Sequence, residues 1–173
     1  MEEKFNIVVG QSGGPTTVIN ASLYGVIRAA FENSDKIGKV YGMINGIEGF
    51  INGKFMDLRE EMSDDEIELL KSTPSSYLGS CRYKLPDSME DAMYRQIFEK
   101  FSNMNIKYFI YIGGNDSMDT VSKLAVYARC TNSDVKIIGV PKTIDNDLVL
   151  TDHSPGFGSA AKYVATTVRD IVM

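Results

Sequence analysis

The sequence has no excess of basic residues, few cysteines and no long hydrophobic run. Among its 173 residues, 18 are lysine or arginine and 23 are aspartate or glutamate, which gives a net charge of −5. Proteins that bind nucleic acid through its phosphates need a basic face, so this charge argues against a nucleic-acid partner. Any anion must then be bound by local positive charge.

The two cysteines, Cys81 and Cys130, are far apart and are not in metal-ligand spacing. This pattern indicates reduced thiols in a cytoplasmic protein rather than a disulfide framework, and we expect both to be small buried hydrophobic residues. No apolar stretch approaches the length needed to cross a bilayer, and the charged residues 2–4 precede a predicted strand rather than a signal-peptide core. We therefore expect a soluble protein that is neither exported nor bound to a membrane.

Short runs rich in β-branched and aromatic residues alternate with helical patterns, which is typical of βαβ units. They predict an α/β fold, a doubly wound and mostly parallel sheet with helices on both faces. The predicted strands are 5–9, 39–43, 108–112 and 136–140, and the predicted helices are 18–33, a short helix capped by Ser63 and reaching about residue 71, 89–104, 118–130 and one from about residue 159. Thr16 or Thr17 is predicted to cap the first helix. Residues 42–53 are predicted to be a loop or irregular turn, and residues 72–85 a long loop of the kind that is often functional.

Three of the predicted strands end in glycine-rich or polar turns, at residues 10–14, 113–117 and 141–147. Ligands of open α/β sheets lie outside the carboxyl ends of the strands, so the three turns predict a single cleft. Gly13 and Gly14 allow backbone amides to approach an anion closely, and the helix that follows offers its positive end. We therefore expect this cleft to bind phosphate.

Each turn also has a purely structural explanation. Gly13 and Gly14 match neither a P-loop nor the dinucleotide fingerprint, so they could simply form a tight turn. Asp116 or Ser117 could simply cap the helix that follows, and the turn at 141–147 could be an Asx-rich turn without chemistry. The only histidine, His153, is interpreted as a packing or surface residue.

The third turn carries groups suited to phosphoryl transfer. Asp145 is a candidate general base, because transfer to a hydroxyl needs a carboxylate within hydrogen-bond reach of the attacking oxygen. Lys142 would face the phosphate charge, and Thr143 can donate its hydroxyl to a phosphoryl oxygen. Asp147 would orient Lys142 or cap the turn, and a metal role for it is the less favoured alternative. Arg82, in the long loop, is a candidate clamp because a guanidinium pairs with phosphate oxygens in a fork.

The segments GQSGGPTTVINA, YLGSCRYK, IGGNDS and PKTIDNDL occur in that order and span nearly the whole chain. Through them the chain resembles the amino-terminal part of the 6-phosphofructokinase family, and PKTIDND is the most specific of the four. The related NAD and lipid kinases share only a GGDG-like turn. The resemblance implies that residues 1–173 are a phosphoryl-donor-binding domain, incomplete at its carboxy end, because the family's MGR motif and later fructose 6-phosphate ligands do not occur. It also implies a homo-oligomer for the full-length protein.

The resemblance implies roles for individual residues. Asp145 would take the proton from the 1-hydroxyl of fructose 6-phosphate, and Thr143 would contact the sugar or the transferred phosphate. Lys142 and Asp116 would complete the catalytic set. The donor-binding residues would be Gly13, Gly14, Arg82, Tyr83, Gly114 and Ser117. The family position that supports magnesium is Asn115 here, and its amide oxygen can ligate Mg²⁺ without adding charge.

The residue at position 116 bears on the choice of donor. ATP-dependent members of the family usually carry glycine there, whereas pyrophosphate-dependent members carry aspartate, whose charge and bulk occupy the space of the nucleotide α-phosphate. Asp116 and Lys142 therefore favour a glycolytic enzyme that uses pyrophosphate, fructose 6-phosphate and Mg²⁺. The alternatives are an ATP-dependent 6-phosphofructokinase and a non-catalytic phosphate-binding fragment. Tyr24 stands where regulated bacterial members carry an effector-binding arginine, so we do not expect nucleotide regulation of that type.

Overall fold

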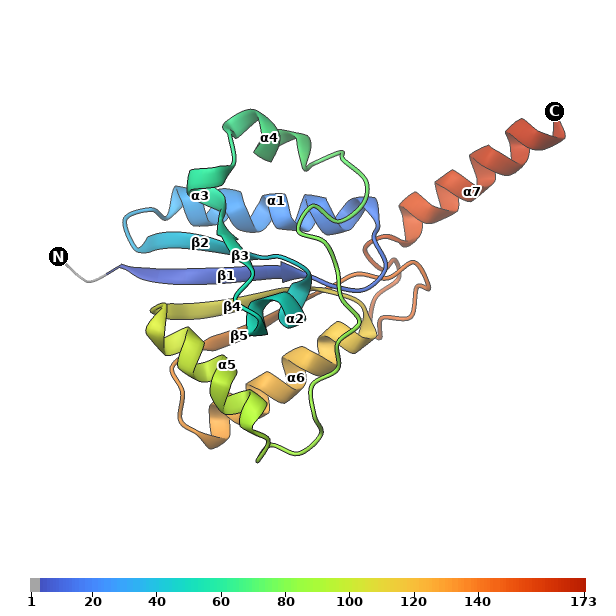
Figure 1. The fold of residues 1–173 in the computed structure, drawn as a ribbon. Coiled ribbons are helices and arrows are strands. Elements are labelled where there is room, and N and C mark those ends of the chain that lie inside the picture. Colours follow the sequence, from blue (N-terminus) through green and yellow to red (C-terminus); the bar gives the residue numbers. More distant parts are fainter. Residues whose placement is uncertain (1–3) are drawn as a thin grey trace.

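A computed structural model describes residues 4–173, so residues 2 and 3, predicted to precede the first strand, lie outside the described part. Five strands form one sheet in the order β3-β2-β1-β4-β5 (Figure 1). The strands are β1 (Phe5–Gln11), β2 (Ile37–Met43), β3 (Phe55–Asp57), β4 (Ile106–Gly113) and β5 (Lys136–Pro141). All neighbours pair in parallel except β2 and β3. The predicted mostly parallel α/β fold is confirmed.

Helices cover both faces of the sheet because its strands are apolar on both sides (Figure 1). On β1, the side chains of Ile7 and Val9 pack on one face and that of Val8 on the other, as the alternation of a strand requires. The first face is covered by α1 (Thr17–Glu32), α3 (Leu58–Glu61) and α4 (Asp64–Leu69), and the second by α2 (Gly46–Ile51), α5 (Ala92–Asn103) and α6 (Asn115–Cys130). Two apolar cores therefore sandwich the sheet.

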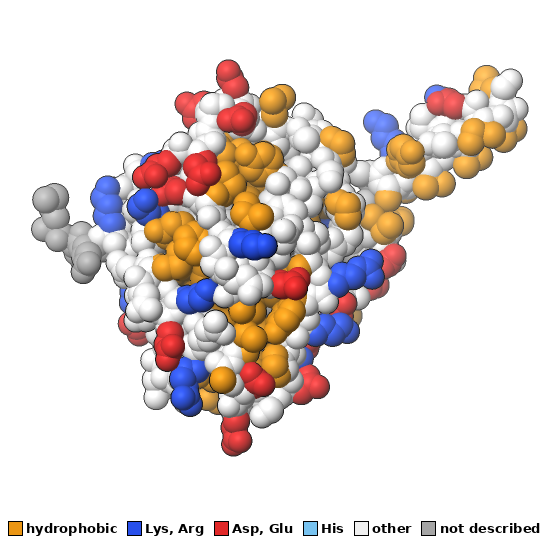
Figure 2. Space-filling view, in the orientation of Figure 1, with side chains coloured by type: hydrophobic (Ala, Val, Ile, Leu, Met, Phe, Trp, Pro, Cys, Tyr) orange, Lys and Arg blue, Asp and Glu red, His pale blue; other side chains and the backbone are white. Residues whose placement is uncertain are grey.

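The last helix, α7 (Phe157–Val172), projects away from the sheet (Figure 1). Every residue of α7 is described, and none of them is buried. Figure 2 shows hydrophobic side chains along this helix, and its exposed large ones are Tyr163, Val164, Val168, Ile171 and Val172. No helix within residues 4–173 combines the length and the hydropathy that a membrane span requires.

The prediction that residues 42–53 form a loop was wrong, because α2 occupies the middle of this segment. Asn45 precedes the helix with a left-handed φ of 59°, and the side chains of Ile47 and Phe50 are fully buried. A side chain at Gly49 would overlap the carbonyl oxygen of Ile44. The glycines of this segment therefore allow a short helix to pack tightly against the sheet.

In the rest of the chain, some predictions made from local sequence patterns were confirmed and others were wrong. Ser63 forms the predicted capping box with Glu66 at the start of α4. Thr16 is the N-cap of α1, but its side chain makes no capping hydrogen bond. Cys81 is buried as predicted, whereas the burial predicted for Cys130 was wrong because this residue is exposed at the end of α6. The three-residue strand β3 and the four-residue helix α3 were not predicted, since elements this short carry no periodicity.

Candidate functional site

The three predicted turns meet at the carboxyl ends of β1, β4 and β5. The backbone N–H of Ser12 donates to the carbonyl oxygen of Ile112 at 2.9 Å, and that of Lys142 donates to the carbonyl oxygen of Gly113, also at 2.9 Å. All of the predicted site residues line two adjoining pockets that share Gly14, Gly114 and Asn115. The structure thus brings these residues together, while the roles assigned to them stay predictions.

The first pocket, of about 280 Å³, lies between the first turn, the loop at 72–85 and the start of α6. Its lining residues are Ser12, Gly13, Gly14, Cys81, Arg82, Tyr83, Gly114, Asn115, Asp116 and Ser117. Gly13 has a φ of 81°, a conformation that glycine adopts readily and other residues rarely do. We call this the donor pocket, because it contains every residue predicted to bind the phosphoryl donor.

The second pocket, of about 320 Å³, lies between the first turn and the third. Its lining residues are Gly14, Pro15, Thr16, Gly114, Asn115, Lys142, Thr143, Ile144 and Asp145. Thr143 is buried, and its hydroxyl accepts a hydrogen bond from the backbone N–H of Asp145 at 3.0 Å. The turn is completed by Asn146, whose side chain bonds to the backbones of Asp152 and Ser154. We call this the acceptor pocket, since it contains the candidate base.

Lys142 connects the two pockets. Its side chain is buried, and its ammonium group donates a hydrogen bond to the carbonyl oxygen of Gly14. A side-chain carbon built at Gly13 would lie 3.6 Å from the Lys142 Nζ, so the ammonium sits directly beside the donor pocket. Burial lowers the pKa of Lys142, and the nearby carboxylate of Asp145 opposes this effect. The lysine side chain therefore lies between the two pockets.

Asp147 contacts Asn115 rather than Lys142, so the interpretation in which it orients the lysine was wrong. The Asn115 Nδ2 donates to the Asp147 Oδ2 at 2.9 Å. This bond and a second one from the Thr143 hydroxyl lower the pKa of Asp147. Amide and carboxylate oxygens are ligands that Mg²⁺ accepts, so the pair fits a divalent ion. Within residues 4–173 no three histidine, cysteine, aspartate or glutamate side chains cluster in a way that could hold a metal, so its other ligands would be donor oxygens and water.

Asp116 and Ser117 lie inside the first turn of α6 and do not cap it. The helix begins at Asn115, three residues earlier than predicted, and Gly114 is its N-cap without a side-chain hydrogen bond. Ser117 is buried, whereas the side chain of Asp116 is 79% exposed at the donor pocket. The capping explanation is therefore wrong, and the aspartate carboxylate lies at the edge of the pocket, near the positive end of the helix.

A buried amide network lies beneath the donor pocket and was not predicted from the sequence. Gln11 and Asn20 are fully buried, and the Gln11 Nε2 donates to the Asn20 Oδ1 at 2.9 Å. The Gln11 Oε1 accepts from the backbone N–H of Leu78 at 2.8 Å, and the Asn20 Oδ1 accepts from that of Tyr77 at 2.9 Å. These bonds fasten the long loop to β1 and α1. Two features of the sequence could have indicated this network: the amide of Gln11 at the end of an apolar strand and the amide of Asn20 on the apolar face of a helix.

Two serines continue this attachment into the pocket. The Ser80 hydroxyl donates to the carbonyl oxygen of Gly13 at 2.7 Å, and the Ser12 hydroxyl donates to that of Cys81 at 3.1 Å. Beneath them, the Tyr111 hydroxyl accepts a 3.1 Å bond from the backbone N–H of Ile47, and burial raises the pKa of this tyrosine. The long loop, although irregular, therefore has a defined path that carries Arg82 into the donor pocket.

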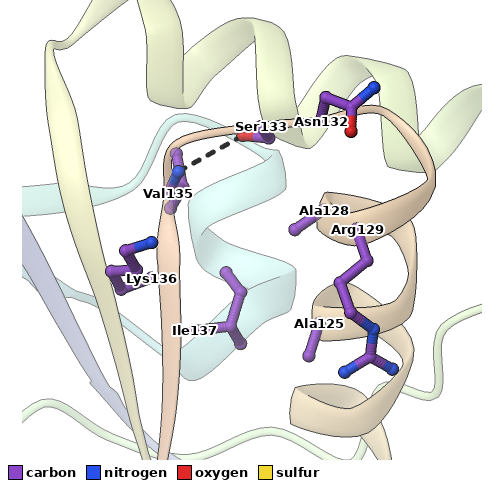
Figure 3. Close-up of a pocket in the computed structure, with 8 residues that line it drawn as sticks. All are labelled: Ala125, Ala128, Arg129, Asn132, Ser133, Val135, Lys136 and Ile137. Atoms are coloured by element: carbon purple, nitrogen blue, oxygen red, sulfur yellow. Dashed lines mark hydrogen bonds between the residues drawn. The ribbon is translucent and has the colours of Figure 1, made fainter.

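A larger hollow, of about 480 Å³, lies at the other end of β5 (Figure 3). It is lined by Ala125, Ala128, Arg129, Asn132, Ser133, Val135, Lys136 and Ile137. The backbone N–H of Val135 donates to the Ser133 hydroxyl at 3.4 Å across its rim (Figure 3). It contains none of the predicted site residues and no carboxylate, so it lacks the base that phosphoryl transfer to an alcohol needs.

Comparison with known proteins shows relatives that match nearly the whole chain. The chain is 47% identical over 166 residues to a pyrophosphate--fructose 6-phosphate 1-phosphotransferase of Halomonas elongata, which covers 95% of this chain and 39% of that protein. A similar enzyme of Methylococcus capsulatus is 45% identical over 166 residues, with 95% and 39% covered. The crystal structure of a pyrophosphate-dependent phosphofructokinase from Nitrosospira multiformis superposes with a TM-score of 0.86 at 45% identity, covering 94% of this chain and 40% of that one. The chain thus spans about two fifths of these relatives. Residues 6–173 match the model of the phosphofructokinase family, and the chain belongs to that family.

Proposed function

We propose that this chain is the phosphoryl-donor domain of a pyrophosphate-dependent phosphofructokinase. The reaction is the transfer of one phosphoryl group from pyrophosphate to the 1-hydroxyl of fructose 6-phosphate, which gives phosphate and fructose 1,6-bisphosphate. The observation that carries the proposal is the Asp116 carboxylate at a small donor pocket that adjoins a second pocket containing Asp145. Relatives with 45–47% identity are named for this reaction.

The charge at the donor pocket supports pyrophosphate over ATP. A nucleotide would have to bring its α-phosphate past the negative charge of Asp116, whereas pyrophosphate has no third phosphate to place there. Discrimination by an introduced repulsion of this kind is a common source of specificity.

The acceptor pocket supports a mechanism by positioning and proton removal. The sugar hydroxyl oxygen attacks the nearer phosphorus, its proton passes to the carboxylate of Asp145, and the bond to the leaving phosphate breaks. On donor binding the Thr143 hydroxyl exchanges its bond to Asp147 for one to an equatorial phosphoryl oxygen, and the Lys142 ammonium compensates the charge between the two pockets. Backbone amides at Gly13 and Gly14 bind the leaving phosphate.

We include a magnesium ion in this proposal. Asn115 and Asp147 would hold it, and when bound it would reduce the negative charge of the donor's phosphoryl oxygens. We also propose a cytoplasmic location, because Cys81 and Cys130 are free thiols, and a homo-oligomeric full-length enzyme, as the resemblance to the 6-phosphofructokinase family implies.

A pyrophosphate-binding protein without turnover is the second candidate. It is supported by the open acceptor side, where Asp145 is exposed and α7 buries no residue. An assay of the purified chain for formation of fructose 1,6-bisphosphate from pyrophosphate distinguishes the two, with Asp145→Asn as the inactive reference. Turnover that depends on Asp145 supports the enzyme. Pyrophosphate binding without turnover supports the binding protein, and absence of pyrophosphate binding contradicts both.

A further inference from the structure

An ion pair lies beside the donor pocket and was not anticipated from the sequence. The Lys84 Nζ is 3.1 Å from the Asp116 Oδ1, and the two side chains are 68% and 79% exposed. Asp116 lines the pocket, and Lys84 directly follows Arg82 and Tyr83, which also line it. The pair therefore joins the long loop to the start of α6 at the pocket.

Both partners are presented by well-anchored backbone. Asp116 lies in the first turn of α6, and Ser117, which follows it, is buried. On the other side, the carbonyl oxygen of Cys81 accepts a bond from the Ser12 hydroxyl. Leu85 is buried, and its carbonyl oxygen accepts a 3.1 Å bond from the Lys123 Nζ. The backbone of Lys84 thus lies between two anchored residues, which keeps its side chain within reach of Asp116.

The carboxylate of Asp116 needs such a partner in order to select a donor. An exposed aspartate on a helix can rotate its side chain toward bulk water, where it would no longer obstruct a longer polyphosphate. An ion pair restricts that rotation, because leaving Lys84 breaks a contact at 3.1 Å. The strength of an exposed pair is small, which limits how much selectivity it can supply.

We infer that Lys84 is a positioning residue for donor selection, which holds the Asp116 carboxylate where it excludes a nucleoside triphosphate and leaves room for pyrophosphate. The inference rests on the proposed function. Lys84 is not a catalytic residue in it, since it acts on the donor through Asp116.

The quantity to measure is the ratio of the ATP and pyrophosphate dissociation constants, each with Mg²⁺, for the purified chain. Calorimetry gives the value for pyrophosphate, and competition against pyrophosphate gives the value for ATP. Loss of the Lys84 charge by itself weakens the binding of ATP at least as much as that of pyrophosphate, because the α-phosphate of ATP would lie nearest the Lys84–Asp116 pair, so it leaves the ratio unchanged or raises it. Release of the Asp116 carboxylate lowers the ratio, so the two effects differ in sign.

We expect Lys84→Met to lower this ratio about threefold, within the limit of about fivefold set by the strength of an exposed ion pair. Lys84→Arg should keep the parent ratio, because a guanidinium can pair with the same carboxylate. Asp116→Asn should lower the ratio further, and adding Lys84→Met to it should have no additional effect. Lys107→Met is a matched control, since Lys107 pairs with Asp134 at the same distance of 3.1 Å at the opposite end of β4.

The results separate this inference from the proposed function. If Lys84→Met has the same ratio of dissociation constants as the parent chain, the inference is overturned. It is also overturned if Lys84→Met lowers the ratio equally in the parent chain and in Asp116→Asn. Neither result contradicts the proposed function. Failure of the parent chain to bind pyrophosphate, or equal binding of ATP and pyrophosphate, would overturn the proposed function and the inference with it. Thermal unfolding of all variants shows whether a change in the ratio accompanies loss of the fold.

Discussion

Replacement of Gln11 by leucine should weaken both the fold and the donor pocket. The side chain of Gln11 is fully buried at the end of β1 and bonds to the backbone of Ile19 and Leu78 as well as to the side chains of Asn20 and Ser76. Leucine is similar in size to glutamine and cannot form any of these hydrogen bonds. The substitution therefore tests the buried network directly.

The magnitude follows from the partners left behind. The backbone N–H of Leu78 becomes a buried donor without an acceptor, which costs about 1–3 kcal/mol, and the lost bond to Asn20 adds about 1 kcal/mol. Asn20 itself keeps its bond from Tyr77, which limits the damage. We expect a loss of about 3 kcal/mol in the free energy of unfolding. For a domain of this size that corresponds to a decrease of about 6–12 °C in Tm.

Urea denaturation and pyrophosphate titration below Tm measure the two effects separately. The affinity for pyrophosphate should decrease at a temperature where Gln11→Leu is still folded, because the loop that carries Arg82 has lost an attachment. Asn52→Leu is the control, since the Asn52 amide also donates to a backbone carbonyl, at 2.9 Å, but is exposed. It should change stability by less than about 0.5 kcal/mol. A Gln11→Leu protein with parent stability and parent affinity would refute the reasoning.

Three further predictions concern the pockets. Asp145→Asn should lower the rate of fructose 6-phosphate phosphorylation by a full-length enzyme about 10²- to 10⁴-fold and leave pyrophosphate affinity unchanged, and retained activity would contradict its assignment as the base. Asp116→Gly should allow ATP to serve as donor in the same assay, whereas an unchanged donor preference would argue against exclusion by charge and bulk. Because burial lowers the pKa of Lys142, pyrophosphate affinity should decline with rising pH before 10.5, the ordinary value for lysine. Between the lowered pKa and 10.5 the unfolded chain binds more protons than the folded chain, so stability should rise with pH there, and Lys142→Met should remove this rise.

The parts of the fold that were predictable are those specified by local sequence. The four longer strands are apolar runs that stop at glycine or proline-containing turns, and each was found within a few residues. The capping box at Ser63 is a three-residue pattern and was found as predicted. The convergence of the three turns followed from a general property of parallel sheets rather than from any contact visible in the sequence.

The parts that could not be predicted depend on contacts between distant segments. Helix α2 is stabilised by burial of Ile47 and Phe50 against other elements, which outweighs the low helix propensity of its glycines. The exposure of Cys130 reflects its place at the free end of α6, not its residue type. The Gln11 network joins residues more than 60 positions apart.

The contacts made by individual side chains of the site could not be predicted either. Motifs identified which residues would gather at the cleft, and the structure brings all of them to the two pockets. They did not reveal which partner each side chain would choose. Asp147 bonds to Asn115 rather than Lys142, and Asp116 pairs with Lys84, and each of these two contacts joins residues 32 positions apart in the sequence.

The most direct test is titration of the isotopically labelled chain with inorganic pyrophosphate, followed by the chemical shifts of its backbone amides. Separate turns that form one anion site should respond together, with the largest shifts at Gly13, Gly14, Gly114 and Ser117 and a common dissociation constant. Shifts confined to one turn, or centred on the hollow between α6 and the start of β5, would contradict a shared pyrophosphate pocket at the carboxyl ends of the strands.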